Sequence, residues 1–327
     1  MARKTAVVVL LLLAVCAATV AALALGAVSV PFGDVLKSLF GGAVDPSNDK
    51  IVMDLRLPRA VEAIVVGGAL GVAGALLQGA LNNQLASPDI VGVTGGAGFG
   101  AVLILILFPA YIALLPVGAL LFGLAAAALV FAFAWSGTNR GSVSKLILAG
   151  IAIGSMFAAA TTAILTAYPD RVPSVLFFIA GSLTSDGWGD LKAVWPYFAV
   201  GFIFAIGLMR PLDRLALGDE VAASLGTRPQ LIRLFAGIAA ALLAAAAASL
   251  AGLLAFLGLV TPHLVRMAAG TSRHTYVVPV SALAGATLLL VGDTLARVIA
   301  APIELPVGPF MVVLGVPMFL YLLRKEP

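Results

Sequence analysis

Charged residues and cysteine are both scarce in this sequence. Only 10% of the 327 residues are charged and 62% are hydrophobic, whereas about a quarter of a typical soluble domain is charged. A soluble fold cannot bury so much apolar surface, so a soluble globular protein is excluded. Cys16 is the only cysteine, which excludes an intrachain disulfide, a cysteine-based zinc site and an iron–sulfur cluster within this chain.

Signatures of catalysis and nucleotide binding are also missing. The two histidines, His263 and His274, have no acidic or thiol neighbours at ligand spacing, so we expect no metal site. No GxxxxGK[ST] loop occurs, and the glycine-rich segment 92–100 lacks the lysine that meets phosphates. We therefore expect no catalytic residues and no ATP hydrolysis by this chain. The basic residues are scattered singly, which argues against nucleic-acid binding despite the net charge of +4.

Long uncharged runs are what the sequence has in abundance. They cover residues 5–30, 63–88, 90–139, 146–169, 193–209, 234–265, 275–292 and 305–323. A membrane-spanning helix needs about 20 apolar residues, so the runs 90–139 and 234–265 hold two crossings each. Pro109 and Pro116 mark the first internal break and the glycines between 252 and 258 the second. The sequence predicts an all-α polytopic membrane protein of about ten crossings, a single domain over 1–327 whose first span is not cleaved.

The distribution of basic residues indicates an orientation. With ten crossings both termini lie on one side, and cytoplasmic loops carry an excess of Arg and Lys. The side of the termini holds Arg3, Lys4, Arg140, Lys145, Arg210, Arg214, Arg228, Arg233, Arg266, Arg273, Arg324 and Lys325, and the other side holds Lys37, Lys50, Arg56, Arg59, Arg171, Lys192 and Arg297. Twelve against seven predicts that both termini are cytoplasmic.

The segment 213–229 is the longest polar stretch on the predicted cytoplasmic side. Asp219 and Glu220 suit the first turn of a helix, Gly226 can end that helix, and Pro229 can begin another. We expect two short helices joined by a glycine turn. Two interpretations stay open from composition alone: a solvated loop between spans, and a docking element for a cytoplasmic motor.

Several motifs resemble one family of permeases in order and spacing. LRLPR at 55–59 and the glycine-rich segment 67–98 resemble the signature of the FecCD-type permeases of ATP-binding-cassette (ABC) importers. The resemblance continues through LILAGI at 146–151, FIAGSLTSDGW at 178–188, LGDEVAASLG at 217–226, GLVTPHLVR at 258–266, GDTLAR at 292–297 and ELPVG at 304–308. It covers the chain from about residue 55 to the C-terminus and is highly specific.

The resemblance implies a type II ABC importer permease in a bacterial inner membrane. Such a chain forms a homodimer with the solute pathway at its axis, receives substrate from a periplasmic or lipid-anchored binding protein, and is driven by two cytoplasmic ATPases that use ATP and Mg²⁺. This chain would bind no cofactor. The substrate would be an iron-siderophore first, then haem or cobalamin. A secondary transporter driven by an ion gradient is the alternative.

The resemblance also implies roles for particular residues. Docking of the binding protein would involve Arg56, Arg59 and Arg297, because arginine suits bidentate recognition of carboxylates. The alternative is local pairing on a helix surface, of Arg59 with Glu62 and of Arg297 with Asp293.

The remaining implied roles lie at the cytoplasmic end. Asn83 and Leu85 match one narrowing of the pathway, and Val143 and Ser144 match a second. A pathway narrowed by leucine and valine would gate by excluding water. The alternative is that these four are ordinary turn and packing residues. This chain departs from the family at Gln84, where proline is usual, and at Val143, where the cobalamin permease has threonine. The ATPase-coupling residues would be Leu217, Gly218, Asp219, Glu220, Ala223, Leu225, Gly226 and Arg228.

Overall fold

A computed structural model of the chain describes residues 2–136, 142–183 and 187–325, of which Ile90 and 318–325 only by their backbone. Arg140 and part of the 178–188 motif lie outside the described residues. The long helices are α1 (Ala2–Ala24), α4 (Leu57–Leu81), α5 (Val93–Leu107), α6 (Leu115–Ala134), α7 (Val143–Ala167), α9 (Trp188–Leu215), α11 (Pro229–Ala251), α12 (Leu257–Ala269), α13 (His274–Val298) and α14 (Val307–Lys325).

Short helices connect these long ones. They are α2 (Phe32–Phe40), α3 (Pro46–Lys50), η1 (Ile51–Arg56), η2 (Pro88–Val91), η3 (Pro109–Leu114), η4 (Pro169–Arg171), α8 (Pro173–Ala180) and α10 (Asp219–Ser224). Among the described residues no strand occurs. The π-helix η1 and α3 continue into α4, so that one helical rod runs from Pro46 to Leu81.

Within the described part of the chain, seven helices are long and apolar enough to cross a membrane. Two shorter helices are also apolar, α5 and the part of α14 over Val307–Pro317. Helix α12 follows α11 within the run 234–265, for which the sequence predicts two crossings. The two breaks inside long uncharged runs occur where we expected them, since η3 separates α5 from α6 and the segment 252–256 separates α11 from α12. The prediction of an all-α polytopic fold is confirmed.

Helix α4 forms the centre of the structure. Every residue from Val66 to Leu81 is buried, and α4 packs against α13, α11, α12 and α9. Glycines permit this close packing: a Cβ at Gly67 would lie 2.4 Å from the Gly285 oxygen, and one at Gly71 would lie 2.3 Å from the Ser281 oxygen. Small residues at four-residue spacing let helix backbones approach inside a bilayer.

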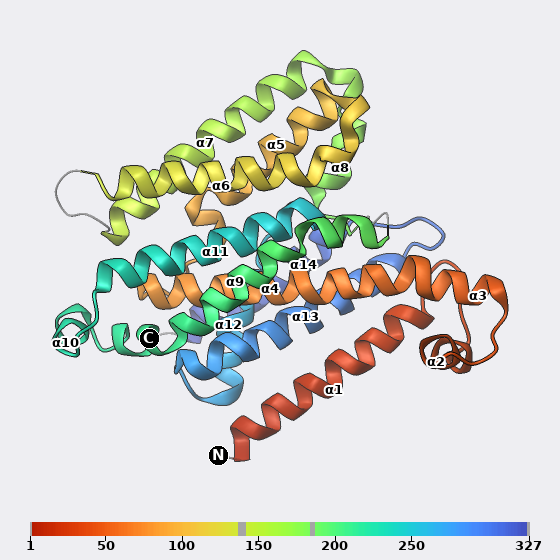
Figure 1. Cartoon of the computed structure of the whole chain (residues 1–327), viewed down its shortest axis with the longest axis horizontal. Helices are drawn as coiled ribbons and strands as arrows, with labels where there is room; N and C mark the ends of the chain where they lie inside the picture. The colour runs from red at the N-terminus through yellow and green to blue at the C-terminus, as the bar shows by residue number, and fades with distance from the viewer. Residues whose placement is uncertain (1, 137–141, 184–186, 326–327) are drawn as a thin grey trace.

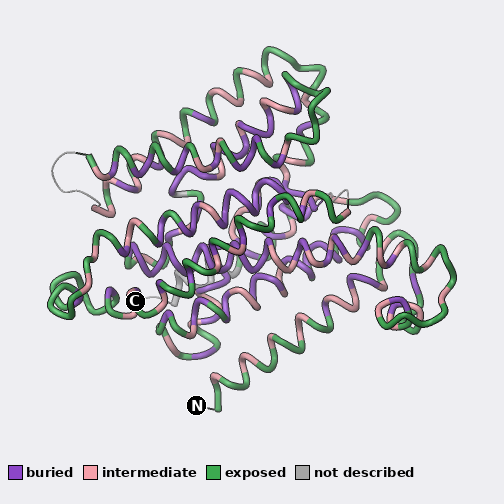
Figure 2. The backbone as a smooth tube through the Cα atoms, viewed as in Figure 1, coloured by how far each residue is buried: buried purple, intermediate pink, exposed green. Residues whose placement is uncertain are grey.

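The helices form a main body and a smaller layer (Figure 1). The layer contains α5, α6, α7 and α8, and α11 joins it to the body through contacts with α6 and α5. Burial is greatest along α4 and α11, while α1 and α7 are largely exposed (Figure 2). Both chain ends and α10 lie toward one end of the molecule, and α2 and α3 lie at the other.

Three irregular segments support one another inside the fold. The Ser182 amide donates to the Ala251 carbonyl at 2.9 Å, the Leu253 amide to the Phe178 carbonyl at 3.1 Å, and the Gly308 amide to the Gly181 carbonyl at 3.0 Å. Non-helical backbone is tolerated at membrane depth only where its polar groups are satisfied by protein or water. These bonds explain how α8, α11 and α14 can begin or end beside one another.

Candidate docking, gating and coupling sites

One buried carboxylate organises the polar cluster at the end of the molecule that carries α2 and α3. The Asp293 carboxylate on α13 accepts hydrogen bonds from two arginines. Its Oδ1 lies 2.8 Å from Arg59 Nη2 and 3.1 Å from Arg59 Nε. Its Oδ2 lies 3.1 Å from Arg297 Nε. Arg59 Nη1 also lies 2.7 Å from Glu304 Oε2. Buried charges persist where they are paired and hydrogen-bonded, and here two carboxylates face two guanidinium groups.

The same cluster holds the end of α1. Arg56 Nη1 donates to the carbonyls of Leu23 (2.7 Å) and Ala24 (2.9 Å), and Arg297 Nη2 donates to that of Ala22 at 3.1 Å. The last four carbonyls of a helix lack intrahelical partners and carry the negative end of its dipole. Arg56 and Arg297 therefore cap α1 and fasten it to α4 and α13.

The three arginines proposed for docking are thus turned inward. Arg56 is 8% exposed and Arg297 5%, and the Arg59 side chain is 14% exposed. The local pair of Arg297 with Asp293 is present, while Arg59 reaches Asp293 and Glu304, which are remote in sequence. Glu304, whose side chain is half exposed, also belongs to this cluster, although we predicted no role for it from the sequence. Docking stays a prediction.

The residues proposed for the first narrowing occupy a tight turn after α4. Asn82 adopts a left-handed conformation with φ of 46°, which asparagine tolerates better than most residues. The Asn83 side-chain oxygen accepts a bond from the Leu85 amide at 2.9 Å, and the Asn83 carbonyl accepts one from the Ala86 amide at 3.1 Å. The turn presents Leu85, which is 47% exposed.

The residues proposed for the second narrowing begin α7. Ser142 caps this helix, since its hydroxyl oxygen accepts the Lys145 amide at 3.4 Å. Val143 is half-buried against the core and Ser144 is exposed. Both narrowings therefore sit at helix ends, and their gating role stays a prediction.

The proposed coupling segment projects from the end of the molecule that carries the chain termini (Figure 1). All eight residues named for coupling are exposed, including Leu217 at 60% and Leu225 at 52%, while Ala222 is fully buried. Gly218 and Gly226 have φ of 101° and 77°, which glycine adopts without strain. Exposed leucines on either side of a short helix outside the spans suit contact with another protein.

One detail of the expected coupling segment is wrong. The segment 213–229 contains a single short helix, α10, instead of two. Helix α9 continues past Pro211 to Leu215, and Pro229 begins the long helix α11. Proline has no cost in the first turn of a helix, where its missing N–H would be unpaired, so the second helix that we expected is the spanning helix itself.

Asp213 joins two helix ends on the same side of the molecule. Its carboxylate accepts the backbone amides of His274 and Thr275, the latter at 3.3 Å, and lies 3.2 Å from His274 Nδ1. Asp213 thereby caps the first turn of α13 from the end of α9. An N-cap is normally adjacent in sequence, so nothing in the pattern around His274 could have identified this partner.

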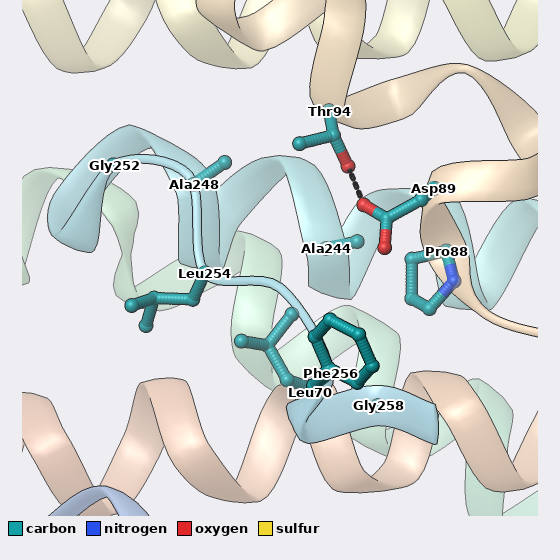
Figure 3. A pocket seen from close by; sticks show the side chains of 10 residues that line it. All are labelled: Leu70, Pro88, Asp89, Thr94, Ala244, Ala248, Gly252, Leu254, Phe256 and Gly258. Atoms are coloured by element: carbon teal, nitrogen blue, oxygen red, sulfur yellow. Dashed lines mark hydrogen bonds between the residues drawn. The ribbon is translucent and has the colours of Figure 1, made fainter. Parts of the chain in front are cut away.

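A small pocket lies beside the middle of α4 (Figure 3). Its wall is apolar except for Asp89 and Thr94, and the Thr94 hydroxyl donates to the Asp89 carboxylate. Leu70, Ala244 and Gly258 come from three different helices. The Asp89–Thr94 hydrogen bond thus joins η2 to the first turn of α5.

Comparisons with known proteins agree with this architecture. The profile of the FecCD transport family matches residues 10–325. The "Fe(3+)-citrate import system permease protein YfmE" of Bacillus subtilis (strain 168) is 35% identical over 94% of this chain and 91% of its own length. The "Fe(3+) dicitrate transport system permease protein FecD" of Escherichia coli (strain K12) is 36% identical over 98% of this chain and 99% of its own length.

A solved structure gives the same result. A chain of a metal-chelate type ABC transporter in an inward-facing conformation is 28% identical, with a TM-score of 0.84. The match covers 99% of this chain and all of the solved one. Sequence and fold therefore agree over nearly the whole length.

Proposed function

Because this chain belongs to the FecCD transport family, we propose that it is the membrane-spanning permease subunit of an ABC importer that moves an iron complex into the cytoplasm. The family match over residues 10–325 carries this proposal. It favours an ATP-driven importer over the ion-gradient alternative. The chain itself would bind no cofactor, and ATP and Mg²⁺ would be used by separate ATPase subunits.

A ferric chelate of the siderophore type is the proposed substrate, with haem and cobalamin next. Two of the similar proteins named above are ferric citrate permeases, and the "Iron(3+)-hydroxamate import system permease protein FhuB" of Bacillus subtilis (strain 168) is 35% identical over 98% of this chain. Citrate and hydroxamate chelates differ in shape but share bulk and polarity. Iron chelation is therefore the common property that these names support.

The proposed assembly is a homodimer in the bacterial inner membrane, with both termini cytoplasmic. The exposure of α7 supports a dimer. Only 17% of its most apolar stretch is buried within one chain, and the side chains of Leu148, Ile151 and Met156 along it are exposed. The position of α10 beside the chain ends supports ATPase binding there. A binding protein would approach the opposite end, beside Glu304.

Docking of that binding protein would involve an exchange of partners. Arg59 is mostly buried and already holds Glu304, whose side chain is 50% exposed. An acidic side chain of the binding protein would replace Glu304 on Arg59. Each edge of a guanidinium group presents its donors to one carboxylate at a time, so Glu304 would have to leave its edge before another carboxylate could bind there. The buried Asp293 would keep Arg59 in place during the exchange.

ATP-dependent uptake into proteoliposomes tests the proposed function. The vesicles carry this chain with its ATPase and binding protein and receive radiolabelled ferric siderophore, haem and cobalamin in parallel. We expect saturable uptake of the ferric siderophore that stops when ATP is removed. Uptake that survives ATP removal but is abolished by an uncoupler would establish the ion-gradient alternative instead.

A further inference from the structure

One arginine connects the proposed coupling helix to the end of α4. Arg233, near the start of α11, grips Asp219 of α10 with both arms of its guanidinium, Nη1 2.9 Å from Oδ2 and Nη2 2.8 Å from Oδ1. Its third nitrogen, Nε, donates to the Ala80 carbonyl at 3.1 Å. The Arg233 side chain is only 13% exposed, whereas that of Asp219 is 54% exposed. One planar group thus joins three helices.

The Ala80 carbonyl lies in the last turn of α4, directly before the turn that carries Asn83 and Leu85. Carbonyls in this turn have no partner within the helix, so Arg233 supplies one from outside. A fork of fixed geometry transmits displacement better than a flexible ammonium would. Arg233 therefore links α10 to the backbone at the start of the Leu85 turn.

A second arginine holds the same turn of α4 from α12. Arg266 Nη1 donates to the Gln78 side-chain oxygen at 2.5 Å, and Gln78 Nε2 donates to the Leu259 carbonyl at 3.1 Å. Gln78 is 3% exposed. These bonds attach Gln78 to α12, in the same turn of α4 as the Ala80 carbonyl that Arg233 contacts.

The groove beside α10 also reaches the start of α7. Asp219, Glu220, Arg228 and Arg233 line it together with Ser142, the residue that caps α7 and directly precedes Val143 and Ser144. An ATPase surface seated on α10 would therefore lie beside both proposed narrowings. Arg233 is the side chain in this groove that is bonded to α4 and α10 at once.

We propose that Arg233 is a positioning residue that transmits ATPase movement from α10, through Asp219 and the Ala80 carbonyl, to the Leu85 turn. This inference rests on the proposed function, because it assigns a mechanical role within an ABC importer. Arg233 touches neither substrate nor nucleotide in this role. It acts by fixing the distance between the coupling helix and the end of α4.

The test compares Arg233→Lys with wild type in the complete transporter in proteoliposomes, measuring ATP hydrolysis and substrate uptake in the same vesicles. Lysine keeps the charge but has one nitrogen in place of the three that Arg233 uses, so it cannot reproduce the two-pronged contact with Asp219 beside the bond to Ala80. We expect ATP hydrolysis to persist while uptake per ATP falls about tenfold, a loss within the range measured for residues along coupling networks. Asp219→Asn, which leaves Arg233 and Ala80 intact, should lower uptake per ATP in the same direction.

A labelling experiment measures whether the Leu85 turn changes its exposure when the transporter binds ATP. In a Cys16→Ser background, Leu85→Cys should react with a maleimide at rates that differ between nucleotide-free and ATP-bound transporter. Adding Arg233→Lys should abolish that difference. Arg214→Lys, at an exposed position near the end of α9, is the matched control and should preserve it.

The outcomes separate this inference from the function on which it rests. Unchanged uptake per ATP in Arg233→Lys would overturn the inference, as would parallel loss of hydrolysis and uptake, which would show that Arg233 serves assembly alone. Absence of ATP-dependent uptake in the wild type would instead overturn the proposed function.

Discussion

The contact between α4 and α12 yields a quantitative prediction for Gly74→Ala. A Cβ at Gly74 would lie 1.7 Å from the Gly258 oxygen and 2.5 Å from its carbonyl carbon. Real Cβ atoms essentially never approach closer than 3.0 Å, so one methyl group forces the two backbones apart by at least 1.3 Å (3.0 − 1.7). Both atoms belong to backbone, so no side chain can rotate away.

Separation of these helices weakens contacts on both sides of α12. A Cβ at Gly258 would itself lie 3.0 Å from Pro88 Cδ and 3.1 Å from the Leu70 carbonyl oxygen, so there is little free space beside this residue. Helix α12 also supplies the bonds of Leu259 and Arg266 to Gln78. Overpacking of this kind costs about 1–3 kcal/mol. Membrane helices are held mainly by van der Waals packing and interhelical hydrogen bonds, so little else compensates. We expect the apparent Tm to fall by roughly 2 to 10 °C.

Thermal denaturation of the purified protein in detergent checks this value. Gly207→Ala is the matched control, since Gly207 lies inside α9 with nothing within 4 Å of its Cβ position. Alanine is favoured over glycine in a helix by up to about 1 kcal/mol, so this variant should melt at or above the wild-type temperature. Equal melting of the two variants would refute the packing argument.

Two further predictions concern the cluster around Asp293. Asp293→Asn leaves the buried guanidinium groups of Arg59 and Arg297 without their shared counter-charge and should destabilise the protein by about 3–5 kcal/mol; wild-type melting and yield would contradict the buried-pair argument. Glu304→Gln removes the carboxylate that competes with the binding protein for Arg59. Exposed ion pairs contribute about 0.2–1 kcal/mol, so affinity for the binding protein should rise by roughly 1.5- to 5-fold. Surface plasmon resonance measures this change. Unchanged or weaker binding would argue against partner exchange at Arg59.

The sequence by itself determined the long apolar spans, the breaks between them and some of the helix ends. An apolar run of sufficient length must become a helix in a bilayer because backbone polar groups find no water there, so each crossing follows from local composition. The break around η3 follows from the proline pair, and the end of α10 from Gly226, for the same local reason. Arg297 and Asp293 are four residues apart on one helix, and their pairing was predictable from that spacing.

Only the tertiary structure decided which helices meet and which polar groups pair across them. Arg59 and Glu304 are 245 positions apart, and Arg233 and Ala80 are 153 apart. The apolar runs look alike in sequence, so nothing local identifies α4 as the buried centre or directs three arginines inward toward α1 and Asp293. Those choices depend on close backbone approach at glycines such as Gly67, Gly71 and Gly74, and hence on the shape of whole helix faces.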